Sequence, residues 1–131
     1  MPNISTQLLR SKYFKGTSYR QIAPSGKRCG KTSWRRWPRR CYHTPVLTRS
    51  SCENACTKFN DCIAYSHKEA LRICHLFISS KTESCPSGYI LASGPAITTI
   101  DQLIGVDEDG ISGCYGKVRS KTKYASTYCL F

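Results

Sequence analysis

The sequence predicts an α+β fold class: a small disulfide-rich domain in which one helix is followed by several short strands. Five of the nine cysteines lie between residues 52 and 85, in a pattern that suits nested disulfides. Leu, Ile, Val and Phe supply only 25 of the 131 residues, so apolar burial alone would give a thin core. Disulfides worth roughly 2–4 kcal/mol each would bring such a core to ordinary stability.

The net positive charge is confined to one end of the chain. Residues 1–50 contain 12 Lys and Arg and no acidic residue, whereas residues 51–131 contain 8 basic and 8 acidic residues. We therefore expect a basic, acid-free N-terminal arm over residues 1–40, of which residues 1–28 are extended with at most short strands. The disulfide-rich domain, with a C-terminal extension, is expected over residues 41–131.

The cysteine content also predicts the compartment. Nine cysteines in a short chain favour an oxidising environment, and the odd number leaves at least one thiol free or bonded to another chain. No apolar run approaches the ~18 residues of a membrane span. The first 20 residues lack the apolar stretch of a secretory signal, and an acid-free N-terminal region is also typical of organellar transit peptides. We expect an extracellular or secretory-pathway lumenal location; the alternative is an organelle lumen, as part of a membrane complex.

One helix is expected, over residues 51–59. Ser50 and Glu53 have the spacing of a capping box, in which the Ser hydroxyl accepts from the amide three residues on and the Glu side chain reaches back. Cys52 and Cys56 are four residues apart, so both lie on one face of this helix. That face is expected to point into the core.

Short strands and turns are predicted for the rest of the domain. Residues 67–70 favour a turn between two strands, although a helix over residues 67–76 is an alternative, because several residues there favour helix. The expected strands cover residues 62–66, 72–78, 88–93 and 96–104, and a further turn is expected over residues 107–110.

The helix cysteines could be cross-linked to the strands that follow. If Cys56 bonds Cys62, a small loop joins the end of the helix to the first strand. If Cys52 bonds Cys74, a larger loop joins the start of the helix to the second strand. The two loops would nest, and one helix would lie across a β-hairpin and be tied to it at both ends.

This arrangement resembles the central part of a PAN/apple domain, over roughly residues 41–95. In that family a helix with two cysteines precedes a hairpin with one cysteine on each strand. The second of these is often followed by any residue and a leucine, as in Cys74-His75-Leu76 here. Residues 62–66 resemble the first strand of the family's hairpin, and residues 87–91 resemble the later strand that closes its sheet.

The resemblance implies one helix packed on a twisted antiparallel sheet of about five strands. It also implies two nested disulfides between helix and hairpin, and in many members a third bond joins the two ends of the domain. The implied nested pairs are Cys52–Cys74 and Cys56–Cys62, and the candidates for the third bond are Cys29 or Cys41 with Cys85 or Cys114.

Metal binding and catalysis are not predicted. Structural zinc needs four close ligands, and Cys52 with Cys56 could supply one pair, but no good second pair is present. The acids at 107–109 fail the register of a calcium loop and favour a turn. Cysteines in disulfides cannot act as nucleophiles, so the neighbouring histidines are expected to be packed or on the surface. We expect no metal, no cofactor and no enzymatic activity. The histidines are His43, His67 and His75.

The candidate binding site is the run from residue 34 to residue 40, which places four guanidinium groups beside two indoles. Arginine binds sulfate, phosphate and carboxylate in a bidentate manner, and indole faces can stack on sugar rings or bases. In the alternative, the indoles pack on the domain and arginine stems cover them. The candidate residues are Trp34, Arg35, Arg36, Trp37, Arg39 and Arg40.

Two functions follow from these observations. The first is a non-catalytic PAN/apple-like recognition module that binds a protein partner or a sulfated or acidic glycan through its sheet face and loops. The second is a structural accessory subunit of a large organellar or membrane-associated complex, whose basic arm wraps an acidic neighbouring subunit. Nucleic acid is not an expected partner, because an oxidised protein rarely meets it and no known nucleic-acid-binding motif is present.

Overall fold

The computed structural model describes residues 16–31, 35–79 and 81–119. The chain divides into two compact units, Met1–Ser18 with Val118–Phe131, and Tyr19–Lys117. The second unit contains the helix, the described disulfides and most of the sheet. Trp34 of the candidate binding site, the first 15 residues of the expected arm and the ninth cysteine, Cys129, lie outside the described residues.

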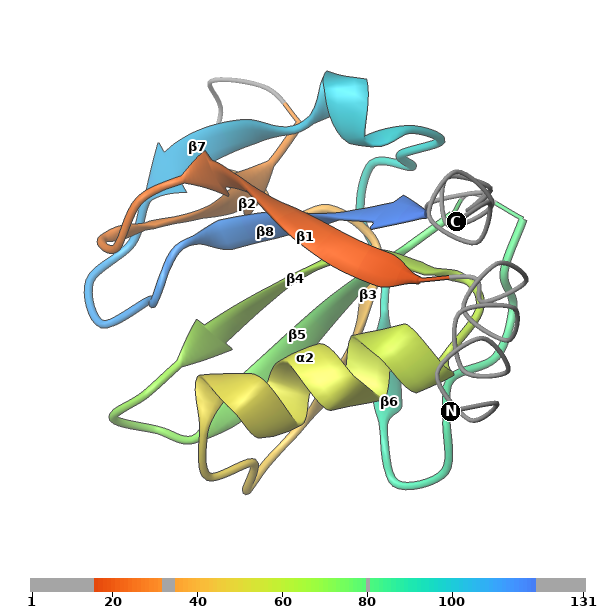
Figure 1. Cartoon of the computed structure of the whole chain (residues 1–131), viewed down its shortest axis with the longest axis horizontal. Coiled ribbons are helices and arrows are strands. Elements are labelled where there is room, and N and C mark those ends of the chain that lie inside the picture. Colours follow the sequence, from red (N-terminus) through yellow and green to blue (C-terminus); the bar gives the residue numbers. More distant parts are fainter. Residues whose placement is uncertain (1–15, 32–34, 80, 120–131) are drawn as a thin grey trace, which may run out of the picture. The chain divides into compact units, whose positions relative to one another are not determined.

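A six-stranded sheet forms the main layer, with the strand order β1-β8-β4-β5-β3-β6 (Figure 1). A second, two-stranded sheet pairs β2 with β7 in antiparallel fashion. In the main sheet β8 pairs β4, β4 pairs β5, β5 pairs β3 and β3 pairs β6, all antiparallel. The strands are β1 (Thr17–Ala23), β2 (Lys27–Gly30), β3 (Arg40–His43), β4 (Cys62–Lys68), β5 (Ile73–Ile78), β6 (Ile90–Ala92), β7 (Ile104–Asp107) and β8 (Cys114–Arg119).

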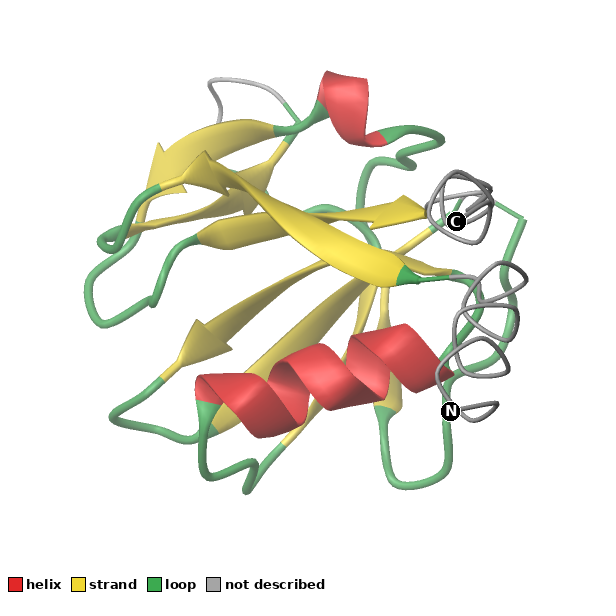
Figure 2. Cartoon of the chain, in the orientation of Figure 1, coloured by secondary structure: helices red, strands yellow, loops and turns green. Residues whose placement is uncertain are grey.

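One α-helix, α2 (Arg49–Lys58), is present among the described residues, and it packs on β4 and β5 (Figure 2). The predicted fold class is confirmed: a helix lies against an antiparallel sheet that is cross-linked by disulfides. The main sheet has six strands instead of about five. Residues 67–76 form the expected hairpin of β4 and β5, and not the alternative helix.

The helix starts two residues earlier than predicted. Thr48, and not Ser50, is its N-cap: the Thr48 Oγ1 accepts from the Ser51 N–H at 3.1 Å. Glu53 does not reach back to close a capping box at the predicted place. Its carboxylate instead accepts a hydrogen bond of 2.6 Å from the Tyr65 hydroxyl on β4. Both Thr and Ser can cap a helix, and here Thr48 does so while Glu53 is engaged by a tertiary contact.

The strand predicted over residues 96–104 does not form. The Gln102 side-chain oxygen accepts from the backbone N–H groups of Thr98 and Thr99, and residues Ile100–Gln102 form a short 3-10 helix, η1. Strand β7 then begins at Ile104, and the turn expected after it falls at residues 109–110. Local side-chain bonds to the backbone therefore outweigh the β-branched composition of this segment.

Part of the predicted arm is strand. Residues 17–23 form β1 next to β8, and residues 27–30 form β2, which is tied to β8 by a disulfide from Cys29 to Cys114. Gly26, with φ of 93°, takes the left-handed conformation in the turn between the two strands, which glycine adopts without steric cost. The basic segment after residue 16 is thus built into the fold.

The two faces of the sheet carry two separate cores, because neighbouring residues on a strand point to opposite faces. Tyr65 and Leu76 face the helix, in a cluster rich in cysteine. Ala64 and Phe77 face the opposite side, where Cys29, Cys114, Ile97 and Leu103 cover them.

Four disulfides join these layers among the described residues. Two tie the helix to the hairpin, in the pairs that the resemblance to PAN/apple domains implies. Both earlier candidates for a further bond form one: Cys29 bonds Cys114, and Cys41 bonds Cys85. The bonds are Cys52–Cys74, Cys56–Cys62, Cys41–Cys85 and Cys29–Cys114.

Candidate functional site

The segment before β3 crosses the sheet face opposite the helix, with Trp37 as its anchor. The Trp37 ring lies 4.3 Å from the ring of His75 and 6.2 Å from that of Phe77, measured between centroids. Two guanidinium carbons lie over the indole as well, Arg28 at 4.1 Å and Arg40 at 4.7 Å from the ring centroid. Other protein groups therefore cover the indole. For Trp37 this is the alternative in which the indole packs on the domain and arginines lie over it.

A close backbone approach fixes this segment from the other side. The Arg39 N–H donates to the Pro95 carbonyl at 3.1 Å. Gly94 lies so near that a Cβ added to it would fall 2.2 Å from the Trp37 carbonyl oxygen. Pro38, between Trp37 and Arg39 in the chain, is buried. The loop that carries the arginines is thus held in one place on the sheet.

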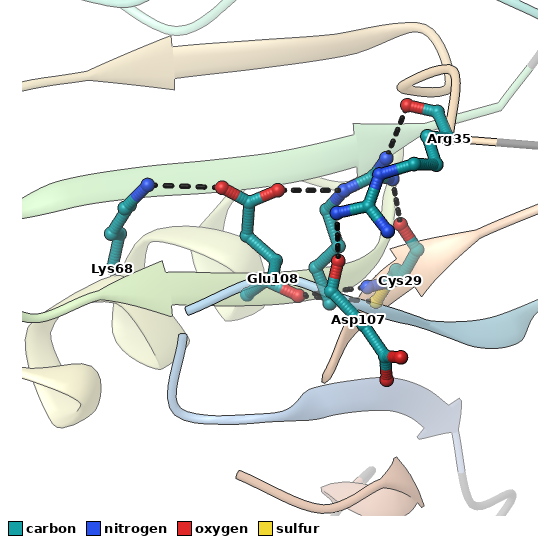
Figure 3. Close-up of polar contacts among 7 residues, drawn as sticks. Cys29, Arg35, Lys68, Asp107 and Glu108 are labelled. Atoms are coloured by element: carbon teal, nitrogen blue, oxygen red, sulfur yellow. Dashed lines mark hydrogen bonds and ion pairs between the residues drawn. The ribbon is translucent and has the colours of Figure 1, made fainter. Parts of the chain in front are cut away.

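Arg28 is the buried centre of the site, with a side chain only 1% exposed. Its Nη1 donates to the Cys29 carbonyl at 3.0 Å, and its Nη2 donates to the Arg35 carbonyl at 2.7 Å. Its Nε lies 3.7 Å from the Glu108 carboxylate, which also pairs with Lys68 at 3.0 Å (Figure 3). Burial lowers the pKa of Arg28 while Glu108 opposes that shift, and an arginine stays charged in proteins.

Arg35 links the same loop to β7. Its Nη2 donates to the Asp107 carbonyl at 3.1 Å, as Figure 3 shows. The Asp107 carboxylate is engaged by Lys27 at 2.7 Å, and this hydrogen bond with its charge lowers the pKa of Asp107. The two carboxylates of this region, Asp107 and Glu108, therefore already have cationic partners.

Exposed positive charge remains next to these paired groups. Arg35 and Arg36 are exposed, and Arg36 has no hydrogen bond or ion pair to any residue that the structure describes. Arg39 is half-buried and engaged within the protein. The arrangement can bind an anion at the exposed guanidinium groups, while the packed ones beneath hold the loop in place.

His75 lies beneath Trp37 and is 6% exposed. Burial, together with the nearby charges of Arg40 and Arg28, lowers the pKa of His75 to about 3. The ring is therefore neutral at ordinary pH, and its Nδ1 has no hydrogen-bond partner among the described residues. A neutral, covered imidazole of this kind has a packing role under the indole.

The predicted site residues thus separate into two groups. Trp37 and Arg40 pack into the protein, since the Arg40 Nη1 also donates to the Pro38 carbonyl at 3.1 Å. Arg35 and Arg36 are the exposed pair. Sequence reasoning missed Arg28, because the acid that neutralises it is 80 residues away and no local pattern marks a buried arginine.

Metal ligands do not gather within the part of the chain that the structure describes, where no group of three or more His, Cys, Asp or Glu could hold a metal ion. Among the same residues no helix is long and apolar enough to cross a membrane. Comparison with protein-family models, with curated proteins and with solved structures found no match.

Proposed function

We propose that this chain is a non-catalytic recognition module, similar to a PAN/apple domain, that binds an anionic partner. The partner is an acidic protein segment or a sulfated glycan. Arg35 and Arg36 provide the direct contacts, and Arg39 and Arg40 add positive potential beside them. The proposal rests on one observation: two exposed guanidinium groups lie on a loop that is fixed by packed neighbours.

Preorganisation is the physical reason why this loop suits binding. A flexible arginine loses side-chain and backbone entropy when it binds, and this loss reduces affinity. Here the Arg35 carbonyl and its side chain are both hydrogen-bonded, to Arg28 and to the backbone of Asp107. The cost of ordering the loop is therefore met largely by folding, and the planar guanidinium groups can meet sulfate or carboxylate in a bidentate manner.

The disulfides support an oxidising location for this function. Four disulfides among the described residues are typical of secreted, surface or lumenal proteins. We place the module outside the cell or in the lumen of the secretory pathway, where sulfated glycans and acidic protein segments are both accessible.

The test is binding of the oxidised full chain to heparin-type glycan and to an acidic peptide, as a function of salt. The Arg35→Ala plus Arg36→Ala variant is expected to bind at least about tenfold more weakly, since charge-assisted hydrogen bonds contribute roughly 1.5–3 kcal/mol each. The matched control removes two exposed cations elsewhere, Arg20→Ala plus Lys58→Ala, and is expected to have a much smaller effect.

Equal loss in both double variants would mean that only net charge matters, and the site would be rejected. Association with a protein partner that survives about 0.5 M salt, where exposed charges are screened, would instead support an accessory subunit of a larger complex.

A further inference from the structure

Two of the most exposed apolar side chains lie on loops that are tied to each other. Leu47, just before α2, is 65% exposed, and Leu71, in the turn between β4 and β5, is 57% exposed. The Val46 N–H donates to the Arg72 carbonyl at 2.7 Å, and the Thr44 Oγ1 donates to the Leu71 carbonyl at 3.1 Å. Figure 1 shows both loops at the lower left, next to the start of α2. We call Leu47 and Leu71, with Arg72, the leucine tip.

Part of the backbone of the leucine tip is hydrogen-bonded within the protein. The carbonyls of Leu71 and Arg72 accept bonds from the Thr44 hydroxyl and the Val46 N–H, and the Val46 carbonyl is 2.6 Å from the His67 Nε2. An apolar environment penalises a polar backbone group that lacks a partner. Because these carbonyls already have partners, they add little penalty when the loops leave water.

Positive charge lies beside the leucines. Arg72 is exposed and follows Leu71 directly, whereas the Arg49 guanidinium, two residues after Leu47, lies over the Tyr115 ring at 4.4 Å from its centroid. Arg72 also has a φ of 55°, the only positive φ of a non-glycine residue in the described part of the chain. Glycine would take this conformation without steric cost, so the chain has a cationic residue at a position where the backbone favours glycine. The nearest acid along the chain, Glu69, has its carboxylate held by the Ser112 hydroxyl at 2.7 Å.

We propose that the leucine tip binds the surface of an anionic lipid bilayer, with Leu47 and Leu71 entering the interface and Arg72 contacting headgroups. Exposed leucines at loop ends, beside a cation, match the apolar and anionic layers of such a surface. A second copy of the chain fits less well, because a two-fold contact would bring the same arginine of each copy together. This site is distinct in its residues from the arginine loop and does not depend on the proposed function.

The experiment is co-sedimentation of the oxidised full chain with vesicles of phosphatidylcholine, with and without phosphatidylserine. The chain is expected to bind the vesicles that contain phosphatidylserine. The Leu47→Ser plus Leu71→Ser variant is expected to partition about tenfold less, from the lost apolar burial. Arg72→Gly is expected to partition about fivefold less, from one lost cation near the surface, with no loss of thermal stability.

A matched control replaces two exposed apolar residues on another element, Ile90→Ser plus Leu91→Ser, and is expected to keep the wild-type partitioning. The proposal is overturned if the wild type ignores the anionic vesicles, or if the leucine variant partitions as the wild type does. It is equally overturned if the wild type self-associates in sedimentation velocity and the leucine substitutions abolish that association, since the tip would then be an interface between copies.

Discussion

Trp37 shows how one side chain can turn a charged sequence motif into a packed one. Its indole contacts His75 and the guanidinium groups of Arg28 and Arg40, so the motif contributes to the core as well as to the surface. Arg28 has no apolar substitute here, because it also bonds the carbonyl of Arg35. Removing such a buried cation would leave its polar partners without bonds, which is costly.

His75 predicts a pH dependence of stability. Its folded pKa, lowered to about 3, lies below the ordinary value of 6.5, so the unfolded chain binds a proton first as pH falls. The stability that it contributes is complete above the unfolded pKa and is lost as pH falls toward the folded one. Between about pH 8 and about pH 5 the free energy of unfolding should fall by about 2 kcal/mol through this residue.

The measurement is chemical denaturation of the oxidised protein across that pH range. The His75→Gln variant, neutral at every pH, should lose this part of the slope, whatever its absolute stability. His43→Gln, at a half-buried histidine whose ring lies 5.0 Å from that of Tyr89, is the matched substitution control. An unchanged slope in His75→Gln would show that the ring is accessible to protons in the folded state.

At the scale of elements, substitutions at Thr48 and Ser50 test which residue is the N-cap of α2. Thr48→Ala should lower the free energy of unfolding by about 1 kcal/mol, because the Ser51 N–H loses its acceptor. Ser50→Ala should have little effect, since Ser50 is exposed and lies inside the first turn. Denaturation of both variants with the disulfides intact gives the comparison. A larger cost for Ser50 than for Thr48 would contradict the observed start of the helix.

The elements differ in how far the sequence alone predicts them. The helix and the hairpin of β4 and β5 are predictable, because their signals are local: two cysteines four residues apart and an alternating strand. The strands β1 and β2 are not, since their partners come much later in the chain: Asp107 on β7 pairs with Lys27 on β2, and Tyr115 on β8 lies 94 residues after Gln21 on β1. Residues 96–104 mislead because their β-branched composition suits a strand, whereas the Gln102 side chain bonds the backbone instead.

The sequence predicts which loop forms the candidate site, but not which of its side chains are exposed. The run of arginines and tryptophans identifies the correct loop, but tertiary contacts decide which of its members are exposed. Arg40 and Trp37 pack, while Arg35 and Arg36 remain exposed, because Arg28 and Gly94 come close to the loop. Gly94 comes from a distant part of the chain, and the burial of Arg28 depends on Glu108, which is also distant in sequence.

At the scale of the molecule, the four disulfides reach every layer of the fold. They span 6, 22, 44 and 85 residues of sequence, so the loops that they close range from one turn to most of the domain. In the chain-entropy account the longest loop contributes about 4–5 kcal/mol and the shortest about 2 kcal/mol. Contributions of this size explain how a chain with so few large apolar residues can hold a fixed arginine loop.

The most direct test of this disulfide-linked fold is therefore disulfide mapping by mass spectrometry of peptides cut from the unreduced protein. The structure predicts linked peptides for 29 with 114, 41 with 85, 52 with 74, and 56 with 62. Free thiols at these positions, or other pairings, would contradict the fold and, with it, the rigid presentation of Arg35 and Arg36.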